Sequence, residues 1–317
     1  MFNYPYQNFY EVMEANAKNA PKKTAIFVDD RKVTYAKLKQ NIDTFARFLE
    51  FSGIRSGDRV AMIVGNSEEF VVSLFAITKI GAIAVPLNTF LKKEEFEYIL
   101  NDCGARMLIS SASFANETKN LLDSTKIEKI VWTDKYDNLD ERNYSFTEID
   151  ASLETHERLV KSPRLDDLAC IVYTSGTTGT PKGVILTHKN IMYNVRELPF
   201  LIALESSDLW VSILPSWHIF ERAAEYLALS KGCCTVYSTI KTFASDLEHY
   251  KPTLVATVPR LWESMYTKIN TALEKKDAKK AKIFKKLVAI SAAYNYNLRV
   301  LKEELPVFED RKSTRLN

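Results

Sequence analysis

The sequence predicts an α/β fold in which largely parallel sheets are layered with flanking helices. Three observations lead to this prediction. First, 317 residues, of which 46% are hydrophobic and 26% charged, supply an ordinary core and exclude a mainly disordered chain. Second, amphipathic helical patterns alternate with short apolar runs. Third, a loop rich in Gly, Ser and Thr separates two strand-like segments, as expected where ligands gather beyond the carboxyl ends of strands.

The first part of the chain alternates between helix and strand. Thr34 is placed to cap a helix whose apolar residues follow a 4-3-4 spacing from Leu38 to Leu49, and Gly53 ends it. The segments that follow are predicted, in chain order, as strand 59–64, helix 68–79, strand 82–87, helix 92–101, and strands 107–110 and 129–133. This order indicates βαβ units with right-handed crossovers around a parallel sheet.

A polar and weakly patterned stretch over 138–163 divides the chain. The length of the chain suggests roughly two lobes. We therefore expect a first lobe at about 1–163 and a second at about 164–308, joined by this stretch.

The second part of the chain resumes the strand pattern. We expect a strand over 166–173, a loop over 174–183 and a further strand over 184–187. Thr187 is placed to cap a helix whose apolar residues include Ile191 and Val195.

Charge, cysteine content and the N-terminal sequence bear on the partner, the state of the cysteines and the cellular compartment. Lys and Arg number 43 and Asp and Glu number 40, so a net charge of +3 gives no indication of a nucleic-acid partner. The four cysteines have no CxxC spacing, which favours buried thiols over disulfides or a zinc site. The N-terminus lacks a secretory signal, and Lys79 and Gly81 interrupt the most apolar stretch, 70–87. We therefore expect a cytoplasmic protein.

The loop over 173–183, YTSGTTGTPKG, has the residues that an anion site needs. Its glycines let backbone N–H groups converge on an anion, its hydroxyls add donors or a magnesium ligand, and Lys182 adds a compact positive charge. The spacing differs from a Walker A loop, and no GxGxxG occurs. An exposed linker has a similar composition and is the alternative. Phosphate is the anion that fits this loop.

The longer run YTSGTTGTPKGVILTH resembles the phosphate-binding signature of the AMP-forming adenylating enzymes. This superfamily includes acyl-CoA synthetases, luciferases and the adenylation domains of peptide synthetases. The resemblance implies that the phosphates of ATP are contacted by Thr174, Ser175, Gly176, Thr177, Thr178, Gly179 and Lys182. It also implies that Thr174 or Thr178 lies near a Mg²⁺ ion.

Two further segments resemble the long-chain fatty acyl-CoA synthetase branch of that superfamily. LPSWHIFER over 214–222 is similar to its LPxxHxxER pattern, which implies that His218 is catalytic and lies beside the carboxylate and the adenylate. Trp217 lines the acyl entrance or packs in the core. TVPRLWE over 257–263 is similar to a VPRxxE stretch of the same branch, which implies that Pro259 lies at the acyl pocket.

The resemblance implies an ATP-dependent ligase. Such enzymes join a carboxylate to ATP, release pyrophosphate, and then transfer the acyl group to the thiol of coenzyme A, with Mg²⁺ and preorganised donors holding the phosphate charge. We expect a medium-chain to long-chain fatty acid as the acid. A noncatalytic module that binds a nucleotide or an acyl group, and an aryl or amino-acid adenylating domain, are the alternatives.

The resemblance extends over about 34–308 and covers about the first half of a complete family member. It implies an incomplete AMP-binding N-terminal domain at 1–308, without the adenine segment, the ribose-binding Asp or the C-terminal lid domain with its Lys. The last residues, 309–317, resemble translated adapter sequence, and we expect a non-native tail there. We also expect the isolated chain to be inactive or inefficient in both half-reactions.

A basic run between Lys275 and Lys286 leads into apolar residues such as Ile283 and Leu287. A solvated helix face explains this pattern, and attraction to anionic lipid at the inner face of a membrane is the alternative. Nucleic acid is not expected, because the run has no interleaved aromatic residues for base stacking.

Overall fold

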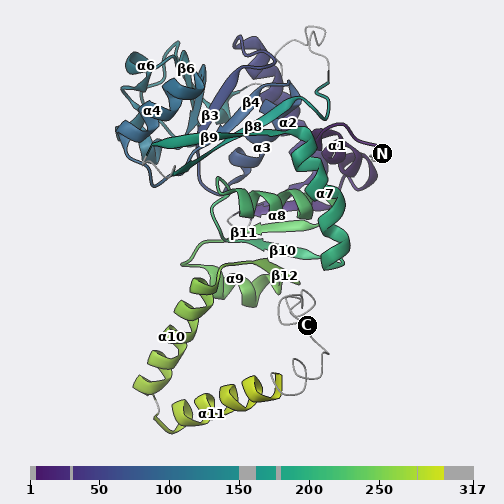
Figure 1. The fold of residues 1–317 in the computed structure, drawn as a ribbon, viewed down its shortest axis with the longest axis vertical. Helices are drawn as coiled ribbons and strands as arrows, with labels where there is room; N and C mark the ends of the chain where they lie inside the picture. The colour runs from purple at the N-terminus through teal and green to yellow at the C-terminus, as the bar shows by residue number, and fades with distance from the viewer. Residues whose placement is uncertain (1–4, 29–30, 150–161, 176–179, 277, 296–317) are drawn as a thin grey trace.

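The computed structural model describes residues 5–28, 31–149, 162–175, 180–276 and 278–295 (Figure 1). The strands of these residues form two sheets. The first has the spatial order β7 (Asn143–Ser145), β6 (Lys129–Trp132), β5 (Met107–Ser110), β3 (Arg59–Ile63), β4 (Ile83–Pro86), β8 (Leu168–Ser175) and β9 (Pro181–Thr187). The second has the order β12 (Leu254–Ala256), β10 (Leu209–Ser212), β11 (Cys234–Tyr237), β1 (Thr24–Val28) and β2 (Arg31–Thr34).

Parallel pairing dominates both sheets. β3 pairs in parallel with β4 and β5, β4 with β8, and β10 with β11 and β12. Antiparallel pairing joins β1 to β2 and β8 to β9. The predicted fold class, layered and largely parallel sheets with flanking helices, is confirmed.

Helices cover and separate the two sheets. In Figure 1, α1, α3 and α8 lie between the sheets, and α4 and α6 lie against the seven-stranded sheet. The described helices are α1 (Phe9–Asn19), α2 (Tyr35–Phe51), α3 (Glu68–Lys79), α4 (Lys93–Cys103), α5 (Ala115–Thr118), α6 (Leu121–Ser124), α7 (His188–Ile202), α8 (Ile219–Ser230), α9 (Phe243–Tyr250), α10 (Pro259–Lys276) and α11 (Ala278–Tyr294).

Local sequence signals fix the ends of the central helices. Thr34 Oγ1 accepts the N–H of Lys37 at 3.2 Å and so caps α2, as predicted. Ser67 Oγ accepts the N–H of Phe70 at 3.2 Å at the start of α3, which has the predicted bounds. Gly53 follows α2 with φ +91°, a conformation that favours glycine.

The predicted loop over 174–183 is wrong in its extent, because both flanking strands continue into it. β8 runs on to Ser175 and β9 begins at Pro181, with Thr174 opposite Lys182. The ladder satisfies backbone N–H and C=O groups whatever the side chains are, so polar residues extend the strands here. The turn over 176–179 lies outside the described residues.

The two sheets draw strands from both parts of the sequence. β1 and β2 join the five-stranded sheet, whose other strands follow residue 208, whereas β8 and β9 complete the seven-stranded sheet. Strand pairing therefore crosses the predicted lobe boundary near residue 163. The division into lobes itself stays a prediction.

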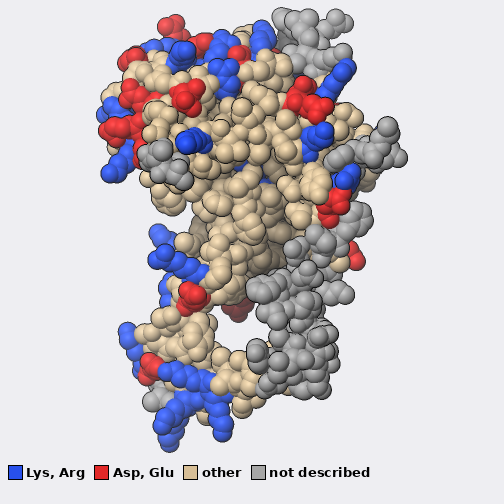
Figure 2. Space-filling view, in the orientation of Figure 1, with Lys and Arg blue, Asp and Glu red and all other residues tan. Residues whose placement is uncertain are grey.

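The last two described helices extend away from the sheets (Figure 1). On α11, the side chains of Ile283, Leu287, Ile290 and Tyr294 are each more than half exposed. Basic side chains gather over these helices in Figure 2. The lipid-contact interpretation of this region stays a prediction. Within the described residues, every helix is too short or too polar to cross a bilayer.

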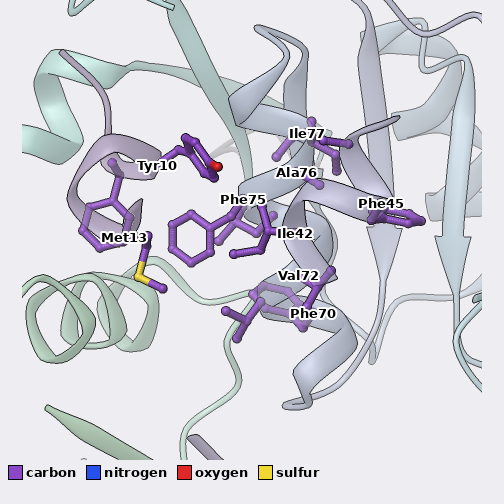
Figure 3. Close-up of a cluster of buried hydrophobic side chains, with 14 of the residues drawn as sticks. Tyr10, Met13, Ile42, Phe45, Phe70, Val72, Phe75, Ala76 and Ile77 are labelled. Atoms are coloured by element: carbon purple, nitrogen blue, oxygen red, sulfur yellow. The ribbon is translucent and has the colours of Figure 1, made fainter. Parts of the chain in front are cut away.

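An aromatic cluster holds the elements between the sheets together. Phe75 of α3 stacks on Phe9 of α1 with ring centroids 5.0 Å apart, and the ring of Tyr226 from α8 lies 4.8 Å from Phe9. Figure 3 shows Phe75 beside Met13 and Ile42, both fully buried. Burial of these rings contributes apolar area to the core between the two sheets.

Removing the central ring tests this core. We expect Phe75→Ala to lower the free energy of unfolding by roughly 3–5 kcal/mol, because the substitution leaves a cavity where the ring is 2% exposed. The matched control is Phe51→Ala at the end of α2, where the ring is 76% exposed and the cost is within about 0.5 kcal/mol. Urea denaturation measures both, and equal costs would contradict the assignment of the core.

Candidate functional site

The carboxyl ends of three neighbouring strands meet at one edge of the seven-stranded sheet. β3, β4 and β8 lie side by side and run in parallel. Asn66 follows β3, Thr89 follows β4, and Ser175 ends β8. Ligands of α/β proteins bind beyond this kind of edge.

The hairpin of β8 and β9 presents a hydroxyl and an ammonium group together. Thr174 lies directly opposite Lys182, so their side chains share a face of the pair, and both residues are exposed. Ser175 is exposed beside them. The predicted phosphate-contacting residues Gly176, Thr177, Thr178 and Gly179 lie outside the described residues.

Gly183 keeps the two strands of this hairpin close. A Cβ atom there would lie 2.9 Å from Ile171 Cγ2 and 3.2 Å from Tyr173 Cζ, both on the opposite strand. The hydroxyl of Tyr173 in turn donates a hydrogen bond to the carboxylate of Asp102 at the end of α4. The glycine therefore lets β9 pack over large side chains that fix β8 to the body of the sheet.

The residues present fit a magnesium ion that is bound mainly through phosphate oxygens. The exposed hydroxyls of Thr174 and Ser175 supply neutral oxygen ligands, and Mg²⁺ commonly combines a few protein oxygens with water and substrate phosphates. The described residues contain no cluster of three His, Cys, Asp or Glu side chains that could hold the ion alone. The predicted metal residue Thr178 lies outside them.

His218 lies in the loop between β10 and α8 and caps that helix. Its Nδ1 accepts the backbone N–H of Phe220 at 3.3 Å. In the neutral ring the proton is therefore on Nε2. The residue is exposed, so Nε2–H is available to donate to a ligand oxygen.

Hydrogen bonds from the other sheet hold the loop that carries His218. Asn66 Nδ2 donates to Leu214 O, and Asn66 Oδ1 accepts the N–H of Ser216, both at 2.7 Å. Trp217 Nε1 donates to Thr89 Oγ1 at 3.2 Å. These bonds hold the His218 loop at the carboxyl ends of β3 and β4. The neighbouring strand β8 of the β8–β9 hairpin ends at the same edge of the sheet.

The predicted acyl-pocket residues lie on two different elements. Trp217 is half-buried, and its ring meets that of Phe90 edge-on with centroids 6.2 Å apart. Pro259 is exposed and begins α10, after β12. Because β12 pairs in parallel with β10, both residues follow the same edge of the five-stranded sheet. Their contacts with an acyl chain, and the roles assigned to the other site residues, stay predictions.

A cluster of buried charges lies behind the loop. Glu221, Arg222 and Glu225 of α8 are at most 3% exposed. Ser216 Oγ donates to Glu225 Oε1 at 2.5 Å, and Ser212 Oγ lies 3.4 Å from the same oxygen. Burial raises the pKa of Glu225 to about 7, and burial beside Glu225 raises the pKa of Glu221 well above its usual range.

Asn66 and the buried glutamates are not among the site residues predicted from the sequence. The signal for the glutamates is their i, i+4 spacing, which places both on one face of α8, a helix that the sequence-based prediction did not include. For Asn66 the signal is only its place directly after a strand, since its partners are about 150 residues away.

The raised pKa of Glu225 makes stability depend on pH. The folded carboxyl group keeps its proton up to about pH 7, whereas the unfolded one releases it near 4.5. The contribution of Glu225 to the free energy of unfolding is therefore fully present below pH 4.5 and is lost as the pH rises to about 7. We expect the stability of the wild type relative to Glu225→Gln to fall by roughly 3 kcal/mol over this range.

Urea denaturation at several pH values measures this difference. Buried His188, whose pKa burial lowers to about 4, contributes the opposite slope, because its unfolded form binds the proton more tightly. This contribution is present in both proteins and cancels in the difference. Parallel stability curves for the two proteins would contradict the assignment.

Comparison with known proteins identifies relatives across most of the chain. A family model described as AMP-binding enzyme matches residues 13–308. A chloroplastic long-chain-fatty-acid–acyl-carrier-protein ligase of Arabidopsis thaliana is 30% identical over 282 residues, 83% of this chain and 39% of that protein. A crotonobetaine/carnitine–CoA ligase of Escherichia coli is 33% identical over 237 residues, 72% of this chain and 45% of that protein. The chain thus spans less than half the length of these curated relatives.

Solved structures share the same arrangement of sheets. A long-chain-fatty-acid–CoA ligase from Archaeoglobus fulgidus is similar with a TM-score of 0.74 at 26% identity, over 87% of this chain and 55% of that one. The anthranilate–CoA ligase AuaEII, in complex with anthranoyl-AMP, gives a TM-score of 0.74 at 28% identity, over 81% and 51% of the two chains. With the family model matching residues 13–308, the chain belongs to the AMP-binding enzyme family.

Proposed function

We propose that this chain carries the phosphate-binding and carboxylate-binding elements of an ATP-dependent fatty acid–CoA ligase. The observation that supports this most strongly is the joining of two elements at one edge. The hairpin with Thr174 and Lys182 and the loop with His218 belong to different sheets, and Asn66 links them. Such a ligase needs groups that bind the phosphates and a group that binds the carboxylate, and it needs them close together.

The proposed reaction has two steps. A carboxylate oxygen attacks the α-phosphorus of ATP, the bond from that phosphorus to the bridging oxygen breaks, and pyrophosphate leaves. The sulfur of coenzyme A then attacks the acyl carbonyl, its thiol proton is lost to a base or to solvent, and AMP leaves. The carboxylate is a poor electrophile until AMP becomes its leaving group, which is why the first step uses ATP.

Four described side chains have roles in the first step. The Lys182 ammonium, with Thr174 and Ser175, binds phosphate oxygens and offsets the charge of the leaving pyrophosphate. Nε2–H of His218 donates to a carboxylate oxygen and orients it. Magnesium held by Thr174 or Thr178 would add positive charge at the phosphates. Because the chain spans less than half of its curated relatives, these roles are tested by binding, and its inefficiency in both half-reactions stays a prediction.

Apolar side chains around His218 support a fatty acid as the substrate. Phe90 is 80% exposed and Phe220 is 52% exposed. The ring of Trp217 contacts the rings of both Phe90 and His218. Two relatives named as long-chain fatty acid ligases agree with this class. An aryl acid is the second candidate, because the anthranilate–CoA ligase is similar over 81% of the chain.

Loss of Lys182 tests the phosphate site. We expect Lys182→Ala to raise the dissociation constant of Mg·ATP by about 10–150-fold, the effect of losing one charge-assisted hydrogen bond. Lys189→Ala is the matched control, since Lys189 is also exposed and is the second residue of the next helix, α7. We expect it to change binding less than twofold. Isothermal titration calorimetry measures both, and equal effects, or no binding by the wild type, would refute the phosphate site.

Acyl preference tests the substrate class. We expect palmitoyl-sulfamoyladenosine to bind the chain at least about tenfold more tightly than benzoyl-sulfamoyladenosine, because each methylene group buried on apolar surface contributes about 0.8 kcal/mol. Competition between the two compounds in a calorimetric titration gives the ratio directly. Tighter binding of the benzoyl compound would favour the aryl class and contradict the fatty acid assignment.

A further inference from the structure

The side chain of Asn66 binds the His218 loop at two points. Its Nδ2 donates to Leu214 O and its Oδ1 accepts the Ser216 N–H, both at 2.7 Å. A carboxamide is suited to this contact because it has a donor and an acceptor in one plane. The two bonds hold both ends of the Leu214–Ser216 segment against the seven-stranded sheet.

A short and rigid path connects this contact to the His218 ring. The N–H of His218 donates to Pro215 O at 2.9 Å, which closes a turn over the segment that Asn66 holds. The ring then accepts the N–H of Phe220, and the His218 carbonyl accepts the N–H of Arg222. A shift of the loop at Ser216 therefore moves the imidazole as well.

The hydrogen bonds of Asn66 and Thr89 differ from that of Ser216 Oγ in this loop, because they join the loop to the opposite sheet. Ser216 Oγ binds Glu225, which belongs to α8 and so stays with the loop's own sheet. In the described part of the chain, the bonds from the loop to the seven-stranded sheet are those of Asn66 and Thr89. The β8–β9 hairpin belongs to that sheet and pairs with β4. The alignment of the His218 loop with the sheet that carries the hairpin thus depends on these bonds.

We infer that Asn66 is a positioning residue that sets the placement of His218 relative to the phosphate-binding hairpin, and so aligns the acid's carboxylate with the α-phosphate. The inference rests on the proposed function. Asn66 itself touches no reacting atom in this role and acts through the loop backbone that it binds.

Two substitutions of Asn66 distinguish its hydrogen bond to Leu214 O from its hydrogen bond to the Ser216 N–H. Asn66→Ala removes both bonds. Asn66→Asp keeps an acceptor for the Ser216 N–H, loses the donor to Leu214 O, and places a carboxylate oxygen beside that carbonyl. Asn16→Ala is the matched control, because Asn16 Nδ2 likewise donates to two backbone carbonyls, Leu229 at 2.8 Å and Ser230 at 3.2 Å. These carbonyls lie at the opposite end of α8 from His218.

Two measurements on the chain give the result. Amide hydrogen exchange at Ser216 reports the bond itself, and calorimetry reports binding of palmitoyl-sulfamoyladenosine and, separately, of Mg·ATP. For Asn66→Ala we expect exchange at Ser216 and the dissociation constant of the acyl compound each to rise about tenfold, with Mg·ATP binding changed less than twofold. We expect Asn66→Asp to keep the Ser216 protection and to give an intermediate loss of acyl-compound binding. Asn16→Ala leaves all three values unchanged.

The outcomes distinguish this inference from the proposed function. Faster exchange at Ser216 with unchanged binding of the acyl compound would make Asn66 purely structural and overturn the inference. Equal losses in Asn66→Ala and Asn16→Ala would have the same consequence. Where Asn66→Ala does not fold, unchanged acyl-compound binding by Asn66→Asp overturns it. Failure of the wild type to bind the acyl compound overturns the proposed function and the inference together.

Discussion

The site depends on one constraint, which is that two separate sheets must present their carboxyl ends to the same space. Apolar packing sets how closely the sheets approach, through the aromatic contacts of Phe9, Phe75 and Tyr226 on α1, α3 and α8. That packing has no strong directional preference, so it fixes separation better than alignment. The bonds of Asn66 to Leu214 and Ser216 supply the direction, because hydrogen bonds weaken steeply when their geometry is lost.

The helix that follows the His218 loop, α8, buries charged side chains in its first two turns. Glu221, Arg222 and Glu225 lie on the first two turns of α8, directly after His218, while the last turns of the helix bury Leu227 and Leu229 in apolar clusters. Burying carboxylates without full pairing is unfavourable, and the raised pKa of Glu225 is a measure of that cost. The polar end of the helix is the end that supports the candidate site. Departures from ordinary core composition are expected beside functional sites.

Local elements could be predicted from the sequence, whereas long-range contacts could not. The bounds of α3 and β5 and the Thr34 cap follow from residues a few positions apart, and the structure confirms them. Both arms of the hairpin were predicted, but their inner ends, 174–175 and 181–183, were missed because their residues resemble a loop. β1 was missed because its pairing partner, β11, is about 210 residues away. Asn66 has no periodic signal, so its partners appear only when the chain is folded. The chemistry of His218 came from resemblance rather than from pattern.

The hydrogen bond at Nδ1 limits what His218 can contribute to the proposed reaction. While Nδ1 accepts the N–H of Phe220, the ring acts at its exposed edge as a donor through Nε2–H. A general base would need a free lone pair there. A fatty acid carboxyl group is already ionised at neutral pH, since unperturbed carboxyl groups titrate near 4, so its attack on ATP requires no base. What the carboxylate requires is one oxygen held in place while the other approaches the phosphorus, and a donor on a clamped loop meets that requirement.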